Sequence, residues 1–240
     1  MIDKRERRPV KRRESDLSLL RQRLADSLVA QALGRCPILR QDTQRDLDRL
    51  RPEGYWDDID YQDQSLMGEW RSGRHLARMF RMATVRQLPE GAAGDRFAEG
   101  ALKALDFWLE RDFRNPNWWW NEIGVPRGVG EVLVLMQDML TPNQLKAGLK
   151  IMDRNDWSAH TGQNLVWGVA IQILRGCLAN SCETVDEGVA RLAWEIRVAR
   201  PGKEGIQADH SFHQHGAVLY SGGYGLCFAC DCAALAAVTR

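Results

Sequence analysis

Apolar side chains recur about every 3.6 residues through most of this chain, and that spacing places them on one face of an α-helix. Within residues 15–33 they are Leu17, Leu20, Leu24, Leu28 and Ala32, after a possible capping residue at Ser15 or Asp16. The same period predicts further helices over 64–83, 95–112, 126–139, 142–152, 165–179, 184–198 and 219–238. No alternating strand pattern of any length interrupts them. Short helices joined by short links favour an all-α array of antiparallel helical hairpins.

The overall composition excludes several classes of protein. The 240 residues include 33 Lys and Arg against 32 Asp and Glu, and a net charge of +1 argues against a globally electropositive nucleic-acid binder. Hydrophobic residues make up 44% and charged residues 27%, which is ordinary for a soluble globular chain. No apolar run approaches the roughly 20 residues that a membrane span needs. We therefore expect neither a nucleic-acid partner nor a membrane partner.

The first residues are strongly basic, and we expect residues 1–14 to form a mobile arm before a folded domain at residues 15–240. Seven Lys or Arg side chains lie within residues 1–13. A secretion signal would continue into an apolar run, but Arg21, Gln22 and Arg23 interrupt the leucines that follow, so no signal peptide is visible. Contact of the arm with nucleic acid or anionic glycan is the alternative to a solvated terminus.

Six cysteines lie at positions 36, 177, 182, 227, 230 and 232. Cys227, Cys230 and Cys232 permit a metal or disulfide interpretation, but structural zinc sites commonly take four ligands from two separated pairs. On a helix, Cys227 and Cys230 share a face that Cys232 does not follow. We expect core thiols, with a metal site or a disulfide as the alternative.

Three consecutive tryptophans, Trp118, Trp119 and Trp120, lie in the asparagine-rich segment NWWWNEIGVP (117–126). Neighbouring side chains diverge by about 100° on a helix and by about 180° on a strand, so the three rings cannot all face one core. A tryptophan face beside amide groups such as Asn121 can stack on a sugar ring while the amides hydrogen-bond its hydroxyls. The alternative is a tryptophan corner that pins the loop to the core.

A second polar segment is TGQNLVW (161–167). Thr161 is placed to cap the helix that follows, and Asn164 would project near the same helix end. Backbone N–H groups at the start of a helix attract negative charge. Asn164 is therefore a candidate functional residue, although asparagine is also common as a simple cap or turn residue.

The third polar segment is DHSFHQHGAVLYSGGYG (209–225), which places three of the five histidines within six residues. One interpretation is a zinc site with the ligands Asp209, His210, His213 and His215. No second ligand pair accompanies them, and acid–base catalysis by one histidine and one tyrosine needs no metal. We favour acid–base chemistry and expect no metal.

Taken together and in this order, the three segments resemble the polysaccharide lyases of the hyaluronate lyase, chondroitin AC lyase and xanthan lyase family. The strings that carry the resemblance are NWWWNEIGVP (117–126), TGQNLVW (161–167) and DHSFHQHGAVLYSGGYG (209–225), and YWDDIDYQDQ (55–64) also looks like an early segment of that family. The resemblance runs from about residue 15 to the end of the chain. It implies an incomplete (α/α) toroid, in agreement with the all-α prediction made from periodicity.

The resemblance also implies a reaction and the residues that perform it. It implies β-elimination from an acidic, uronic-acid-containing polysaccharide of the hyaluronan or chondroitin kind, with no cofactor. The catalytic residues would be Asn164, His215 and Tyr224, whose spacings of 51 and 9 residues are similar to those of the family. Asn164 would neutralise the carboxylate, His215 or Tyr224 would act as the base, and Tyr224 would act as the acid. The expected substrate-binding residues are Trp118, Trp119, Trp120, Asn121 and Gln163.

Family members are usually longer, so the resemblance implies a partial toroid here, with β-sheet domains and further catalytic arginine and glutamate residues beyond Arg240. It also implies an extracellular or periplasmic location, and we expect a monomer. The alternative function is a non-catalytic glycan-binding toroid, in which the tryptophans bind polysaccharide and nothing is cleaved.

Overall fold

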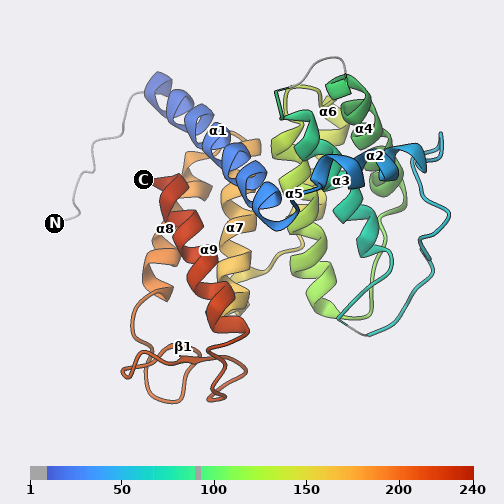
Figure 1. The fold of residues 1–240 in the computed structure, drawn as a ribbon. Helices are drawn as coiled ribbons and strands as arrows, with labels where there is room; N and C mark the ends of the chain where they lie inside the picture. The colour runs from blue at the N-terminus through green and yellow to red at the C-terminus, as the bar shows by residue number, and fades with distance from the viewer. Residues whose placement is uncertain (1–9, 67, 90–92) are drawn as a thin grey trace.

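The computed structural model describes residues 10–66, 68–89 and 93–240 as an array of helices (Figure 1). The α-helices are α1 (Val10–Arg35), α2 (Leu39–Asp48), α3 (Gly73–Arg86), α4 (Ala93–Arg111), α5 (Val125–Leu135), α6 (Pro142–Met152), α7 (Gly162–Leu178), α8 (Cys182–Glu195) and α9 (Tyr224–Thr239). A π-helical turn, η1 (Trp120–Gly124), precedes α5, and a 3₁₀ turn, η2 (Trp157–Ala159), precedes α7. Between α8 and α9, β1 (Gly205–Ile206) pairs antiparallel with β2 (Phe212–His213).

Consecutive helices pair, and the pairs assemble side by side. α3 packs against α4, α5 against α6, and α7 against α8, while α3, α5, α7 and α9 form a row in which each helix contacts the next. α1 crosses this row and contacts all four of its helices (Figure 1). The predicted all-α fold, an incomplete toroid of helical hairpins, is confirmed.

A single hydrophobic core runs through these helices. Its largest fully buried side chains include Trp56, Trp70 and Trp108. Helices of a pair approach closely where a glycine lies at their contact, because a Cβ at Gly188 of α8 would lie only 3.2 Å from Ile173 Cγ1 of α7. This packing fixes the helix ends, and the polar segments that follow or precede those ends are fixed with them.

The N-terminal boundary differs from the prediction. α1 begins at Val10, so residues 10–14 of the predicted arm are helical. Ser15 and Asp16 consequently lie inside the helix and do not cap it. Residues 1–9 of the predicted arm lie outside the described residues. The polar residues at 11–16 gave no apolar period from which the first turns could be predicted.

Helix α2 was not predicted, because its ten residues include only two apolar ones, Leu39 and Leu47, which are too few to show a helical period. The short sheet was missed for a related reason: each of its strands has only two residues, which is too short for an alternating pattern.

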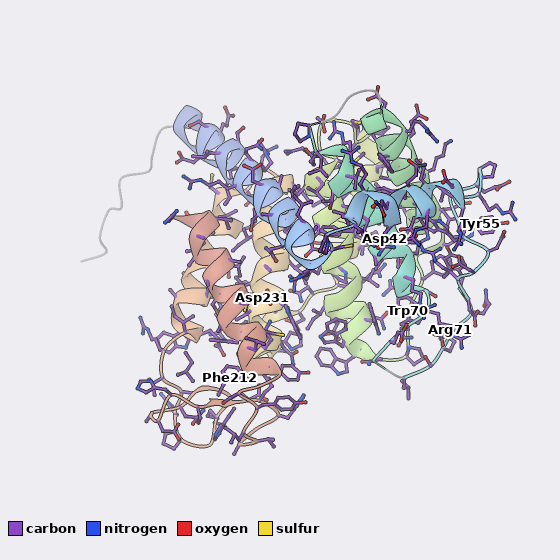
Figure 2. All side chains as sticks on the ribbon, viewed as in Figure 1. Asp42, Tyr55, Trp70, Arg71, Phe212 and Asp231 are labelled. Carbon is purple, nitrogen blue, oxygen red and sulfur yellow. The ribbon has the colours of Figure 1, made fainter. Side chains whose placement is uncertain are left out.

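The helix predicted over 64–83 begins only at Gly73, because Asp63 holds the preceding segment in a loop. The backbone carbonyl of Asp63 accepts a hydrogen bond from Trp70 Nε1 at 2.9 Å, and its carboxylate accepts one from the Arg71 backbone N–H at 2.9 Å. Trp70 and Arg71 lie at the lower right of the molecule in Figure 2. Trp70 is buried, so it contributes to the apolar pattern without being helical.

The expectation for the cysteines is confirmed in part. Cys177 is fully buried, as a core thiol should be, but Cys227 and Cys230 are exposed on α9, and for these two the expectation was wrong. No disulfide joins any of the six cysteines, all of which lie in the described part of the chain. Among the described residues, no helix is both long and apolar enough to cross a membrane.

Candidate functional site

Three segments that are distant in the sequence meet at one end of the row of helices. The backbone N–H of Gln163 donates to Gln214 Oε1 at 2.8 Å, which joins the start of α7 to the segment before α9. The Trp167 ring lies 5.9 Å from the Tyr224 ring and 5.4 Å from the Trp119 ring. The start of α9 lies with β1 at the lower end of the molecule in Figure 1. The segments 117–126, 161–167 and 209–225 therefore form one site.

The three tryptophans point in different directions, as their adjacency requires. Trp118 is 46% exposed, and its ring lies 5.2 Å from the ring of His160. Trp119 packs edge-on against Trp120, and Trp120 also packs against buried Trp70. Trp118 is therefore the most exposed of the three rings, while partly buried Trp119 and Trp120 connect the site to the core.

Carboxylates from other segments accept hydrogen bonds from the residues at the start of α7. Gly162 has φ +59°, and its N–H donates to Glu195 Oε1 at 2.5 Å. Thr161 occupies the cap position without a capping hydrogen bond, so the predicted cap is wrong in that detail; its hydroxyl donates to Glu204 Oε2 at 2.6 Å. The negative charge expected at this helix end is supplied by the chain's own Glu195 and Glu204. Burial raises the pKa of Glu195.

Asn164 and Gln163 are adjacent on α7 but lie in different surroundings. Gln163 is fully buried, and its Nε2 donates to Asp231 Oδ2 at 2.7 Å. The same oxygen accepts from Trp167 Nε1 at 3.0 Å, so Asp231 fixes both side chains. Asn164 is partly buried, and its Oδ1 is inaccessible to water with no hydrogen-bond partner. A buried amide oxygen without a hydrogen bond costs free energy, and such unpaired groups are rare in folded proteins.

His215 and Tyr224 face each other across the segment before α9. Their rings lie 5.0 Å apart at an interplanar angle of 84°, and Tyr220 lies 5.0 Å from Tyr224. His215 has φ +59°, a left-handed conformation that is uncommon for a residue with a Cβ and is concentrated at functional sites. The pKa of Tyr224 is raised, first by burial and then by Tyr220 and Glu204, so its phenol stays protonated and can donate a proton.

Asn121 and Glu122 follow the tryptophans in η1. Asn121 Oδ1 accepts from the backbone N–H of Asn115 at 3.1 Å, and its Nδ2 donates to the Asn115 carbonyl, so both polar atoms of this side chain hold the loop. Glu122 Oε2 lies 3.5 Å from Nε2 of His160, the ring that contacts Trp118. Asn121, which the sequence predicted to bind substrate, therefore holds the loop that carries Trp118.

The alternative zinc site does not assemble. Within the residues that the structure describes, no group of three or more His, Cys, Asp or Glu side chains is arranged to hold a metal ion. This applies to the set Asp209, His210, His213 and His215, and equally to the cysteines of α9.

Several residues that organise the site were missed from the sequence: Glu195, Glu204, Gln214 and Asp231. Gln214 lies between two histidines of a segment that had been singled out, so its position was a signal. The carboxylates carried no such signal, because Glu204 reaches Thr161 across 43 residues and Asp231 reaches Gln163 across 68. Only the fold brings these pairs together.

The fold and these contacts define a class: an α/α toroid domain in which segments carrying an amide, an imidazole and a phenol meet beside aromatic rings. Residues 27–239 match the family described as polysaccharide lyase family 8, N terminal alpha-helical domain. The chain therefore belongs to polysaccharide lyase family 8, and the family resemblance carried by the three segments is confirmed.

Individual relatives agree with this assignment. Chondroitinase-AC from Pedobacter heparinus is 28% identical over 190 residues, which are 77% of this chain and 27% of the relative. Hyaluronate lyase from Thermasporomyces composti is 28% identical over 167 residues, which are 65% of this chain and 21% of the relative. The chain spans about a quarter of the length of these curated relatives.

Solved structures show the same fold. A chondroitinase AC lyase, studied as enzyme–oligosaccharide complexes, superposes with a TM-score of 0.83 at 25% identity over 94% of this chain and 33% of that chain. The chondroitin AC lyase of Streptomyces coelicolor A3, in complex with chondroitin sulphate, superposes with a TM-score of 0.75 at 20% identity over 92% of this chain and 32% of that chain.

Proposed function

We propose that this chain acts as a lyase that cleaves uronic-acid-containing polysaccharide by β-elimination, with Asn164, His215 and Tyr224 as catalytic residues. The observation that supports it most strongly is the meeting of the three segments. The His215 ring lies against the Tyr224 ring, and neighbouring Gln214 is hydrogen-bonded to the α7 turn that carries Asn164. Family membership and the names of the relatives, which are lyases of chondroitin, hyaluronan and xanthan, agree with it.

The reaction would begin with removal of the proton on C5 of the uronic acid. That proton is weakly acidic because its loss adds charge next to an existing carboxylate. A donor aimed at the carboxylate, here the Asn164 amide, lets the charge delocalise, and losing one such donor typically costs about 2.7–4 kcal/mol of barrier. The C5–H electron pair forms the C4–C5 double bond, the C4–O4 bond breaks, and the leaving O4 takes a proton.

His215 and Tyr224 would share the two proton transfers. The raised pKa of Tyr224 keeps its phenol protonated near neutral pH, which suits protonation of the leaving O4. His215 lies beside it and is exposed, which suits a base that must reach substrate from the solvent side. We therefore assign the base to His215 and the acid to Tyr224.

Polysaccharide would bind along the aromatic side of the site. Exposed Trp118 is proposed to stack on a sugar ring, and Trp119 and Trp120 to support it. Gln163 and Asn121, predicted as direct contacts, are proposed to act by holding Asn164 and the Trp118 loop, because Gln163 Nε2 and both polar atoms of the Asn121 amide are engaged within the protein. A polysaccharide substrate would be met outside the cytoplasm, and we propose that the chain acts there as a monomer.

The test is incubation of the folded chain with hyaluronan, chondroitin sulfate and xanthan. A rise in ultraviolet absorbance from the new C4–C5 double bond is expected with at least one polymer. Flat absorbance with all of them would contradict the proposal. Binding without product, lost on Trp118→Ala, would instead support the alternative of a non-catalytic glycan-binding toroid, which the exposed Trp118 favours.

A further inference from the structure

Glu204 connects the two segments that carry Asn164 and His215. Its Oε2 accepts hydrogen bonds from the Thr161 hydroxyl at 2.6 Å and from Gln214 Nε2 at 2.6 Å. Its Oε1 accepts one from the Gly216 backbone N–H at 2.9 Å. Thr161 lies one turn before Asn164, and Gln214 and Gly216 flank His215 on both sides.

Gln214 completes the connection. Its side chain is fully buried, its Nε2 donates to Glu204, and its Oε1 accepts from the Gln163 backbone N–H at 2.8 Å. The residues beside Asn164 and beside His215 are therefore joined through one amide and one carboxylate. Both polar atoms of the Gln214 side chain are hydrogen-bonded within the protein.

The turn held by this connection is strained. His215 has φ +59° and Gly216 has φ +78°, so two consecutive residues are in the left-handed region. A residue with a Cβ in this region costs of order 1–3 kcal/mol and persists only when its surroundings fix it. The hydrogen bonds to Glu204 on either side of His215 are those surroundings.

We propose that Glu204 is a positioning residue, whose carboxylate holds the His215 turn against the start of α7 and so fixes the imidazole relative to the Asn164 amide. This inference rests on the proposed function, because β-elimination requires the His215 imidazole and the Asn164 amide at fixed positions relative to each other. Glu204 acts through Thr161, Gln214 and Gly216 and not on substrate.

The charge of Glu204 has a second, separable effect. It contributes to the raised pKa of Tyr224, after burial and Tyr220 and before Cys227. The rings of His215 and Trp167 also face Tyr224. Because geometry and charge are distinct contributions, two substitutions can separate them.

The experiment compares Glu204→Gln, Glu204→Asp and the control Glu187→Gln, which alters an exposed carboxylate on α8. In Glu204→Gln one acceptor oxygen is replaced by a donor, and kcat for uronate polymer should fall about 10–100-fold, the usual effect of removing an orienting partner, with KM changed less than about twofold. The Tyr224 pKa should fall, as measured by phenolate absorbance against Tyr224→Phe. Glu187→Gln should match the original chain.

Glu204→Asp keeps the charge and shortens the reach. It should leave the Tyr224 pKa raised while kcat stays low, which only a positioning role predicts. Unchanged kcat in both Glu204 variants would overturn the proposal, as would full activity in Glu204→Asp. Circular dichroism and thermal unfolding of each variant establish that the fold is retained.

A readout independent of catalysis separates this inference from the proposed function. Amide hydrogen exchange at Gly216 and Gln163 should become at least about tenfold faster in Glu204→Gln, while Val132 in the core of α5 keeps its protection. If the original chain cleaves no polymer, the proposed function fails, and unchanged exchange at Gly216 would overturn the Glu204 connection on its own.

Discussion

His75 is a buried histidine held neutral by its surroundings. Its Nε2 donates to the Ala104 carbonyl at 2.8 Å, which leaves Nδ1 to accept from the Tyr61 hydroxyl at 3.0 Å. Burial lowers the pKa of His75 to about 4, from 6.5 in its ordinary state. Burial also raises the pKa of Tyr61 to about 12, so the phenol remains the donor of this pair.

The chain should therefore lose stability in mild acid. Between pH 6.5 and about 4 the unfolded state binds a proton at His75 and the folded state does not, so the free energy of unfolding should fall as pH falls through this window. The loss from this residue should be on the order of 3 kcal/mol, since one pKa unit corresponds to about 1.4 kcal/mol. Urea unfolding across this range measures it.

His75→Gln is the matched variant, because glutamine can keep one hydrogen bond and has no proton to gain. Its unfolding free energy should be lower at pH 7 but should change less between pH 6.5 and 4. His210→Asn, which alters an exposed histidine, should follow the original curve. Parallel curves for His75→Gln and the original chain would show that another group governs the acid response.

Asn164, His215 and Tyr224 should each be essential to the proposed reaction. Asn164→Ala should lower kcat about 10²–10³-fold, the usual effect of losing one donor to developing negative charge. His215→Ala and Tyr224→Phe should be comparably severe, while thermal unfolding stays close to that of the original chain. His213→Ala is the control and should be mild. An essential His213 with a dispensable His215 would show that the catalytic histidine was assigned wrongly.

The residues of the site differed in how far the sequence could predict them. Adjacency alone required Trp118, Trp119 and Trp120 to diverge, and the structure shows Trp118 exposed. Asp231 could not be predicted, because its role depends on reaching Gln163 and Trp167 on another helix. Direct contact of a side chain with substrate cannot be predicted from its identity when, as in Asn121, both polar atoms of the amide are already hydrogen-bonded within the protein.

Among the helices whose ends the structure describes, α6 has the most complete N-terminal cap. Thr141 Oγ1 accepts from the Gln144 backbone N–H at 3.2 Å, and Gln144 Oε1 accepts from the Thr141 backbone N–H at 2.9 Å. Pro142 follows the cap, where its missing N–H costs nothing. This reciprocal pair is why the predicted helix over 142–152 has the observed bounds.

Thr141→Ala should destabilise the chain by about 1 kcal/mol, the usual effect of losing an N-cap. For a chain of this size the melting temperature should fall by about 2–4 °C. Asn143→Ala, an exposed change in the same turn, is the control and should alter stability by less than about 0.5 kcal/mol. Equal effects of the two substitutions would indicate that the cap contributes nothing specific.

The helices differed in how clearly the sequence marked their bounds. Pro142 and the capping pair defined α6, and the apolar period defined the centres of α4, α5, α7 and α8. The beginning of α3 was placed too early, because buried Trp70 mimics a helical position from within a loop. Periodicity reports burial, and burial coincides with helix only where local hydrogen bonding does not favour a loop.

In the whole molecule, the site depends on the alignment of helices rather than on any single segment. α7 carries Asn164 and contacts α5, α8 and α9, and α9 begins with Tyr224. The sequence could predict the all-α class and the order of the three segments. It could not predict that Glu204 and Gln214 join two of them, because that contact exists only once the row of helices has formed.

α1 is the element that ties the row together, so it should unfold with the rest of the chain. Leu24 of α1 is buried against the rest of the molecule, whereas Leu19 of the same helix is 51% exposed. Arg21 also donates to the Cys177 carbonyl at 2.9 Å and to Asn180 Oδ1 at 2.7 Å, near the end of α7. Leu24→Ala should cost about 2–5 kcal/mol, and Leu19→Ala less than about 0.5 kcal/mol.

The two variants also test whether the molecule behaves as one cooperative unit. Because a single core includes Leu24 and the buried tryptophans Trp56, Trp70 and Trp108, urea unfolding of Leu24→Ala should show one transition. Helical circular dichroism and tryptophan fluorescence should have the same midpoint, shifted together relative to the original chain. An early loss of helical signal with unchanged fluorescence would mean that α1 melts separately and does not hold the row. The site contacts at the far end of α7 would then be stable without it.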